Sequence, residues 1–220
     1  MITFENVTRT YRTKRGDINA LDSVTTTVTE GSFTVLEGPS GSGKTTLLLA
    51  AAGMLRPTSG KVLVAGKDIY AMPSAQRAAY RAQNIGFVFQ MFHLVPYLNI
   101  IENVLLAAGV ARKAHPQKRA IEVLTQLGLE NRMTHRPAQL SAGEKQRVAI
   151  ARAVFNDPGI ILADEPTGNL DPENGKKVLT HLAQFNKKGT TILIVTHGPE
   201  AKQFATNTIQ MQNGTILQNT

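Results

Sequence analysis

Residues 38–45 read Gly38-Pro39-Ser40-Gly41-Ser42-Gly43-Lys44-Thr45, which matches the pattern G-x-x-x-x-G-K-[ST] of a phosphate-binding loop. A run of strand-forming residues, 32–37, precedes the loop, and an apolar helical run, 46–52, follows it. The motif requires this order of strand, loop and helix. The alternative, a glycine-rich turn without a ligand, needs the strand and the helix to flank the loop by chance.

Each residue type in this loop suits the binding of nucleotide phosphates. Glycines let backbone N–H groups wrap the phosphates, and the start of the next helix adds positive potential. Lys44 is expected to reach the β- and γ-phosphates, and the Thr45 hydroxyl to bind Mg²⁺. The sequence therefore predicts a nucleotide site built from residues 38–45 and Thr46, with Lys44 also serving catalysis.

Strands and helices alternate along the rest of the chain. The runs rich in Val, Ile, Thr and Phe that predict strands are 2–7, 24–29, 32–37, 61–64, 85–89, 160–164, 190–196 and 208–212. Helical patterns separate several of them, which favours an α/β core with a largely parallel sheet. Asn213-Gly214 predicts a hairpin turn near the C-terminus.

The pattern changes between Phe89 and Pro158, where helical runs at 100–110, 116–127 and 142–155 follow each other without a convincing strand. This segment predicts an inserted helical subdomain, 90–158, in a single domain, 1–220, whose core is 1–89 and 159–220. Gly128 is placed to end the second helix and Ser141 to cap the third.

Two acids and a histidine follow apolar strands. Asp164 and Glu165 end the run 160–164, and strand alternation points their side chains in different directions. Asp164 suits the Mg²⁺ shell, while Glu165 suits polarising the water that attacks the γ-phosphate. His197 ends the strand 190–196, at the edge where α/β proteins bind ligands, and is expected to contact the γ-phosphate and orient the water. A structural histidine is the alternative.

Composition excludes several classes of protein. The chain has 220 residues, 42% of them hydrophobic, and no cysteine, so disulfides and thiolate zinc sites are excluded. Its longest apolar run, 47–55, is far short of the roughly 20 residues of a membrane helix. The N-terminus lacks the pattern of a secretory signal, which predicts a cytoplasmic protein. The net charge of +8 is scattered apart from Arg9, Arg12, Lys14 and Arg15, and a solvated surface is the simplest interpretation.

The segment that begins Leu140-Ser141-Ala142-Gly143-Glu144 and continues as a basic helix resembles the ABC signature, LSGGQ. The phosphate loop, Gln90, Asp164-Glu165, the segment 168–171 and His197 follow in the order of the ABC ATPases, so the resemblance covers essentially the whole chain. It implies a P-loop NTPase core, an N-terminal antiparallel β portion and the helical subdomain. It also implies hydrolysis of Mg-ATP.

The resemblance further assigns residues that contact nucleotide across a dimer. Two such domains, as a homodimer or pseudo-dimer, are expected to associate head to tail, each signature closing over the ATP of the other. The residues that this assigns to the partner's nucleotide are Ser141, Ala142, Gly143, Glu144 and Asp171. Tyr11 resembles the aromatic that stacks on adenine, with an ordinary edge-strand tyrosine as the alternative. Gln90 would sense the γ-phosphate and Mg²⁺ and join the two lobes.

A closer similarity is to the lipoprotein-release and macrolide-export ATPases (LolD/MacB type), carried by Phe87-Val88-Phe89-Gln90, by Glu144 and by the segment 163–171. Those ATPases drive permeases that move lipoproteins, lipids, peptides or drugs, and a separate permease is expected for this chain. A peripheral location on the inner face of the cell membrane is therefore expected. The run Phe92, Leu94, Val95, Pro96 and Tyr97 predicts a permease-docking site near Gln90, with packing inside the lobe as the alternative.

Three other functions fit part of the sequence. An ATPase like the cell-division protein FtsE is a close alternative, and a soluble ABC protein acting on ribosomes or nucleic acid is another. A nucleic-acid partner is not expected, because such proteins usually carry two ATPase domains or a long coiled coil. A P-loop kinase has less need of the second acid, Glu165. Three residues depart from the family: Ala142 replaces a signature glycine, Gly198 stands where Asp is usual, and Glu37 precedes the phosphate loop.

Overall fold

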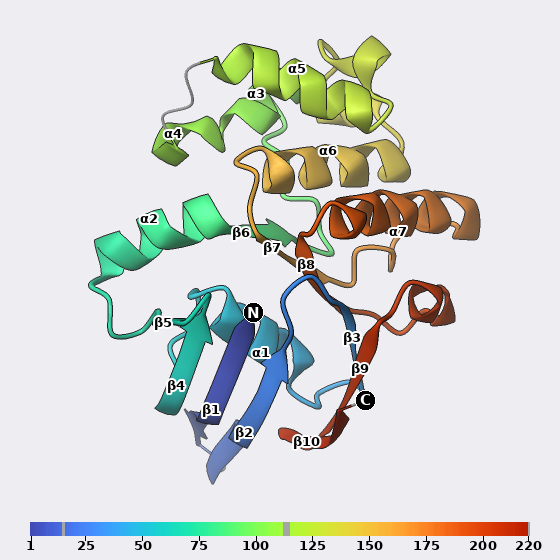
Figure 1. The fold of residues 1–220 in the computed structure, drawn as a ribbon. Coiled ribbons are helices and arrows are strands. Elements are labelled where there is room, and N and C mark those ends of the chain that lie inside the picture. Colours follow the sequence, from blue (N-terminus) through green and yellow to red (C-terminus); the bar gives the residue numbers. More distant parts are fainter. Residues whose placement is uncertain (15, 112–114, 220) are drawn as a thin grey trace.

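In the computed structural model, which describes residues 1–14, 16–111 and 115–219, the chain builds two β-sheets and a layer of helices above them (Figure 1). The strands are β1 Ile2–Thr13, β2 Gly16–Val28, β3 Phe33–Glu37, β4 Ser59–Val64, β5 Lys67–Asp68, β6 Ile85–Val88, β7 Ile160–Asp164, β8 Thr191–Val195, β9 Asn207–Gln212 and β10 Thr215–Asn219. The helices are α1 Lys44–Ala51, α2 Ser74–Asn84, α3 Ile100–Leu105, α4 Ala108–Ala111, α5 Pro116–Gln126, α6 Ala142–Val154 and α7 Pro172–Lys187. Short 3₁₀ turns lie at Glu130–Arg132, Pro137–Gln139 and Pro199–Gln203.

The larger sheet has the strand order β10-β9-β3-β8-β7-β6, and all neighbours except β10 and β9 run parallel. Residues of β3, β7 and β8 alternate between two apolar clusters. Ile161 and Ile192 pack with α6 and α7, while Leu162 and Leu193 pack with α1 and the smaller sheet. The predicted α/β core with a largely parallel sheet is confirmed, and burial on both faces explains its continuous apolar strands.

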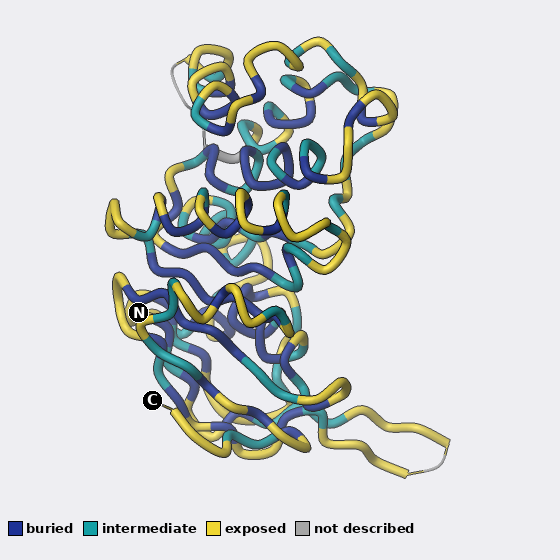
Figure 2. Tube along the Cα trace, turned by 90° about the vertical axis from the view of Figure 1, so that its right-hand side faces the viewer, coloured by how far each residue is buried: buried dark blue, intermediate teal, exposed yellow. Residues whose placement is uncertain are grey.

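The smaller sheet, β2-β1-β4-β5, is antiparallel throughout, as the resemblance implied. Its first two strands are much longer than the predicted runs 2–7 and 24–29, because the intervening residues pair as a hairpin that is largely exposed near its end (Figure 2). Residues exposed on both faces lack the apolar alternation from which a strand is recognised. Of the four basic residues noted in this region, Arg15 lies outside the described residues.

The helices of the segment 90–158 lie over one face of the larger sheet, where α6 packs against β6 and α7 (Figure 1). The predicted helix 100–110 is wrong in one respect: it is two helices, α3 and α4, separated by a turn at 106–107. Gly128, with φ +67°, ends α5, and Ser141 caps α6, both as predicted. Within the described ranges, no helix is sufficiently long and apolar to cross a membrane.

Two helices were not predicted by range. No residue of α2 is buried, so its polar sequence carries little apolar periodicity. Helix α7 has Asp171 as its N-cap, and its buried residues Val178, Leu179, Leu182 and Ala183 follow the helical period, so its sequence carried a signal that the predicted ranges left out.

Candidate nucleotide-binding site

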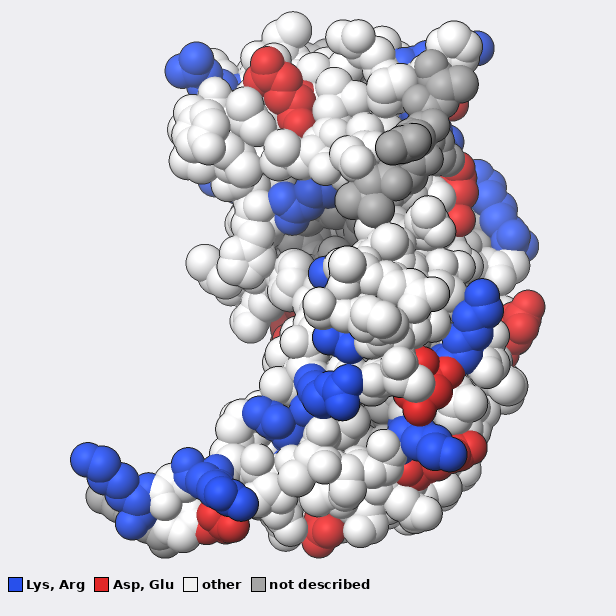
Figure 3. Space-filling model, turned by 90° about the vertical axis from the view of Figure 1, so that its left-hand side faces the viewer, with Lys and Arg blue, Asp and Glu red and all other residues white. Residues whose placement is uncertain are grey.

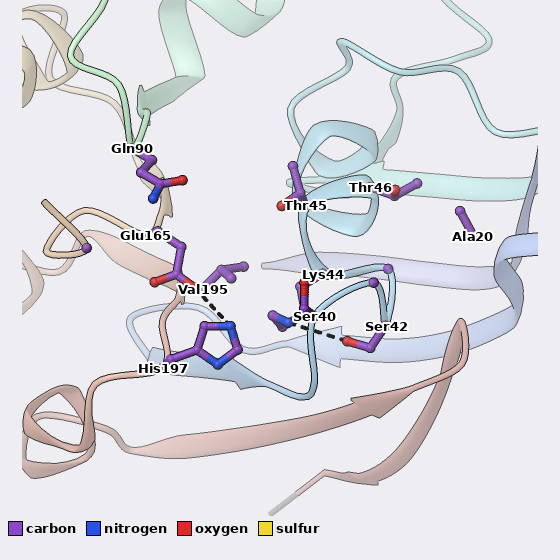
Figure 4. A pocket seen from close by; sticks show the side chains of 13 residues that line it. Ala20, Ser40, Ser42, Lys44, Thr45, Thr46, Gln90, Glu165, Val195 and His197 are labelled. Atoms are coloured by element: carbon purple, nitrogen blue, oxygen red, sulfur yellow. Dashed lines mark hydrogen bonds and ion pairs between the residues drawn. The ribbon is translucent and has the colours of Figure 1, made fainter.

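A cavity of about 610 Å³ opens at the carboxyl ends of β3, β7 and β8, where α/β proteins bind ligands (Figure 4). Its size suits a small organic ligand. The residues that line it are Ala20, Ser40, Gly41, Ser42, Gly43, Lys44, Thr45, Thr46, Gln90, Glu165, Gly168, Val195 and His197. The phosphate loop, the acid that follows β7 and the histidine that follows β8 therefore share one cavity.

The phosphate loop needs its glycines because other backbone lies against it. Gly38 has φ +151°, and a Cβ there would lie 2.0 Å from the backbone oxygen of Met211. Gly43 has φ +102°, and a Cβ there would lie 2.2 Å from the backbone oxygen of Ala20. Both conformations are rare for residues with a side chain. The C-terminal hairpin also contributes a bond, since the Gly214 N–H donates to the Ser42 carbonyl oxygen at 3.0 Å.

Lys44, the first residue of α1, is buried beneath the loop. Its Nζ donates to the carbonyl oxygens of Gly38 at 2.7 Å and Pro39 at 2.8 Å, with Ser42 Oγ 3.5 Å away. Burial lowers the pKa of Lys44, while the nearby carboxylates of Glu165 and Asp164 oppose that shift. A phosphate in the loop would meet a cation that is already desolvated.

Asp164 does not line the cavity itself but contacts Thr45, which does, and Thr45 Oγ1 donates to Asp164 Oδ1 at 3.2 Å. Burial raises the pKa of Asp164, and the bond from Thr45 and the charge of Lys44 act against this. A hydroxyl, a carboxylate and the side-chain oxygen of Gln90 are hard oxygen ligands, which Mg²⁺ accepts together with water and phosphate oxygens. The residues present therefore fit Mg²⁺, although no group of three His, Cys, Asp or Glu that could hold a metal occurs in the described part of the chain.

Glu165 and His197 point toward one another on the same side of the cavity, with His197 Nε2 3.3 Å from Glu165 Oε1 (Figure 4). Glu165 has φ +45°, an uncommon conformation for a residue other than glycine, and its N–H donates to the Val195 carbonyl oxygen of β8 at 2.9 Å. Such backbone strain concentrates at functional sites. Burial raises the pKa of Glu165, and His197 acts in the opposite direction. The pair is arranged for proton transfer or for orienting water.

Tyr11 is not among the residues that line this cavity. It lies on the β1–β2 hairpin opposite Ile18, is 38% exposed, and stacks under the Arg9 guanidinium, 4.7 Å from its ring centroid. Ala20, which lies on β2 two residues beyond Ile18, lines the cavity instead. No motif distinguishes Ala20 in the sequence, because its place depends on the way in which β2 passes the phosphate loop.

The residues assigned to a partner's nucleotide, Ser141, Ala142, Gly143, Glu144 and Asp171, also lie outside this cavity. The Ser141 hydroxyl accepts from the Glu144 N–H, and the Glu144 carboxylate accepts from the Ser141 N–H, which is a capping box at the start of α6. Glu144 also pairs with Arg132 at 2.9 Å. Within the chain, Ser141 and Glu144 therefore cap α6 and Asp171 caps α7. Asp171 also lines a neighbouring cavity of about 220 Å³ with Glu165 and His197.

Asn174 contacts both Asp171 and Gly143, and the sequence analysis predicted no role for it. Asp171 caps α7 by accepting from the Asn174 N–H at 3.0 Å and from its Nδ2 at 2.7 Å. The other end of the amide lies against Gly143, where an added Cβ would lie 2.6 Å from Asn174 Oδ1. The start of α6 and the start of α7 are thus held in a fixed relation by one side chain.

Known proteins are similar to this chain over most of its length. The profile of the ABC transporter family matches residues 21–168. The ABC transporter ATP-binding protein MJ1508 of Methanocaldococcus jannaschii is 42% identical, over 99% of this chain and 98% of that protein. The macrolide export ATP-binding/permease protein MacB of Chlorobaculum tepidum is 40% identical over 99% of this chain, which spans 34% of MacB. A dimeric post-hydrolysis structure of the cassette MJ0796, bound to ADP and Pi, superposes with a TM-score of 0.92 at 38% identity, covering 100% of this chain and 98% of that one.

Proposed function

Because this chain belongs to the ABC transporter family, and is an ABC ATPase, we propose that it powers a separate membrane permease by hydrolysing Mg-ATP in a head-to-tail dimer. One observation carries the proposal. The cavity unites Lys44, Thr45 and the Glu165–His197 pair, whereas the signature residues of the same chain lie outside it. This arrangement supports a dimer in which the signature residues of one chain contact nucleotide held by the other.

The roles of the cavity residues follow from their chemistry. Lys44 binds the β- and γ-phosphates, giving up loop carbonyls for phosphate oxygens. Glu165 accepts a proton from the attacking water, and its raised pKa makes it a better base than an ordinary glutamate. His197 donates to the γ-phosphate and keeps Glu165 in place. Thr45, Asp164 and Gln90 would hold Mg²⁺, which supplies neutralisation of the phosphate charge.

The dimer is supported by the start of α6. Its first N–H groups and the Ser141 hydroxyl form an anion site that has no phosphate loop of its own. The similar cassette MJ0796 is a dimer in two solved structures. Ser141, Ala142, Gly143, Glu144 and Asp171 are proposed to meet the partner's ATP there.

Replacing Gly143 by Ala is expected to weaken ATP-dependent dimerisation by about tenfold. The new methyl would lie 2.6 Å from Asn174 Oδ1 and 3.0 Å from its Cβ, so rotation of the amide cannot relieve the whole contact. Overpacking of this kind costs about 1–3 kcal/mol. Analytical ultracentrifugation with ATP, in a Glu165→Gln background, would measure the dissociation constant of the dimer. Adding Asn174→Ala should recover part of the affinity, and an unaltered dimer in Gly143→Ala would contradict the geometry.

The cargo class rests on similarity to MacB, whose name joins an ATP-binding and a permease part. This chain spans 34% of MacB. A permease on a separate chain is proposed by similarity to the ATP-binding protein MJ1508, which this chain matches over 98% of that protein's length. By that similarity the work is export or membrane extraction of a lipoprotein, lipid, peptide or drug. A tagged chain purified from native membranes should retain one integral membrane protein.

The proposed docking segment is 91–97. Met91 and Tyr97 are 63% and 73% exposed, whereas Phe92, Leu94 and Val95 are half-buried, so part of the run packs inside the lobe. Beside it the surface is hollowed between the upper helices and the rest of the molecule (Figure 3). Arg152, which lines that hollow, donates to the carbonyl oxygens of Phe92 at 2.9 Å and His93. An exposed aromatic at the end of a segment that borders a hollow supports a protein interface.

Replacing Tyr97 by Glu is expected to abolish retention of the membrane chain and leave basal ATPase activity within about twofold. The side chain is exposed, so the substitution buries no charge. Leu217→Glu is the matched control, since Leu217 is also an exposed apolar residue, on β10. Normal retention of the membrane chain by Tyr97→Glu would move the docking site elsewhere.

A further inference from the structure

An ion pair joins the base of the phosphate loop to the segment that carries His197. Glu37 ends β3, directly before Gly38, and its Oε1 lies 3.0 Å from Lys202 Nζ. Lys202 belongs to the 3₁₀ turn Pro199–Gln203, which begins two residues after His197. The Glu37 side chain is 20% exposed, so this pair is partly shielded from water.

Glu37 and the segment that carries His197 are held by the fold to different degrees. Glu37 is fixed by its strand, because β3 lies between β8 and β9 and Glu37 is in register with Gln210. His197 is 58% exposed and follows the end of β8. The next residue, Gly198, has no side chain, and its N–H donates to Thr196 Oγ1 at 3.1 Å. Further along, the segment is held by Ala201, which is buried in the core, and by the ion pair of the next residue, Lys202, with the sheet.

We propose that the Glu37–Lys202 pair positions His197, by tethering the segment 198–202 to the strand that leads into the phosphate loop. The inference rests on the proposed role of His197. It explains two departures together: a side chain that could anchor the segment is absent at Gly198, and an acid that anchors it instead is present at Glu37. Lys202 and Glu37 act through His197, so they are positioning residues that do not touch ATP.

A purely structural pair gives a different expectation. Exposed ion pairs contribute little to stability and are weakened by salt. Loss of such a pair would lower the unfolding midpoint slightly and leave turnover unchanged. A tether acting on His197 would change the rate with little effect on stability, because only the orientation of the histidine in the transition state is affected.

The test compares Lys202→Met and Glu37→Gln with the reversed pair Glu37→Lys/Lys202→Glu. In each single variant kcat at saturating Mg-ATP should fall about fivefold with KM within about twofold, and the reversed pair should recover most of the rate. Lys177→Met is the matched control, because it breaks the exposed pair between Lys177 and Glu173 on α7, 2.7 Å long. That control should keep the wild-type kcat.

A second measurement reads the histidine directly. The chain has five histidines, so isotope labelling of histidine gives a simple NMR spectrum in which His197→Gln identifies one signal. In Lys202→Met that signal should shift or broaden while the other four stay in place. An unmoved signal and an unchanged kcat would overturn the tether. If His197→Ala itself keeps the wild-type kcat, the proposed role of His197 fails instead.

Discussion

Glu165→Gln is expected to bind Mg-ATP normally while kcat falls by about 10²–10⁴-fold, the usual contribution of a positioned general base. The amide keeps the shape and hydrogen bonding of the side chain but cannot accept the proton of the attacking water. Because the two residues are isosteric, the φ of +45° at position 165 carries no added strain. Bound ATP should then persist between two chains, so the variant should be a dimer with ATP.

The measurements for this variant are phosphate release and size-exclusion chromatography with and without ATP. Glu173→Gln is a suitable control, since Glu173 is an exposed acid in the first turn of α7, outside the cavity. It should turn over normally and show no ATP-trapped dimer. Near wild-type kcat in Glu165→Gln would remove Glu165 from the catalytic role.

Lys44→Ala is expected to weaken Mg-ATP binding by about 10–100-fold, because hydrogen bonds to charged groups contribute about 1.5–3 kcal/mol. The loss has two parts. The phosphates lose a cation, and the carbonyl oxygens of Gly38 and Pro39 lose the donor that now lies 2.7 and 2.8 Å from them. The loop should therefore be less well ordered as well as less positive.

Titration calorimetry with Mg-ATP would give the affinity directly, with the variant's hydrolysis monitored separately. Lys61→Ala removes an exposed lysine of β4 and is a control for net charge. Its affinity should equal that of the wild type. If Lys44→Ala binds Mg-ATP as tightly as the control, Lys44 does not hold the phosphates in the way proposed.

Local patterns predicted much of this fold. The buried strands β3, β7 and β8 are uninterrupted apolar runs, and Gly128 and Ser141 end and cap helices through interactions within a few residues. The predicted runs 2–7 and 24–29 were shorter than β1 and β2, because local patterns do not mark the outer part of that hairpin. Its outer residues pair with each other and face water on both sides, so their strand state depends on pairing and leaves no apolar pattern.

The candidate site was likewise predicted only in part. By itself the sequence determined the phosphate loop, the Asp164-Glu165 pair and His197, because each is a short motif that ends or follows an apolar strand, and the ends of parallel strands meet at one edge. Tertiary structure alone decided the 3.3 Å contact of Glu165 with His197, the placing of Asn174 against Gly143 and the pairing of Glu37 with Lys202. These contacts join residues 31 or more positions apart, and their distances depend on how the strands and helices pack. No periodicity within one segment encodes that packing.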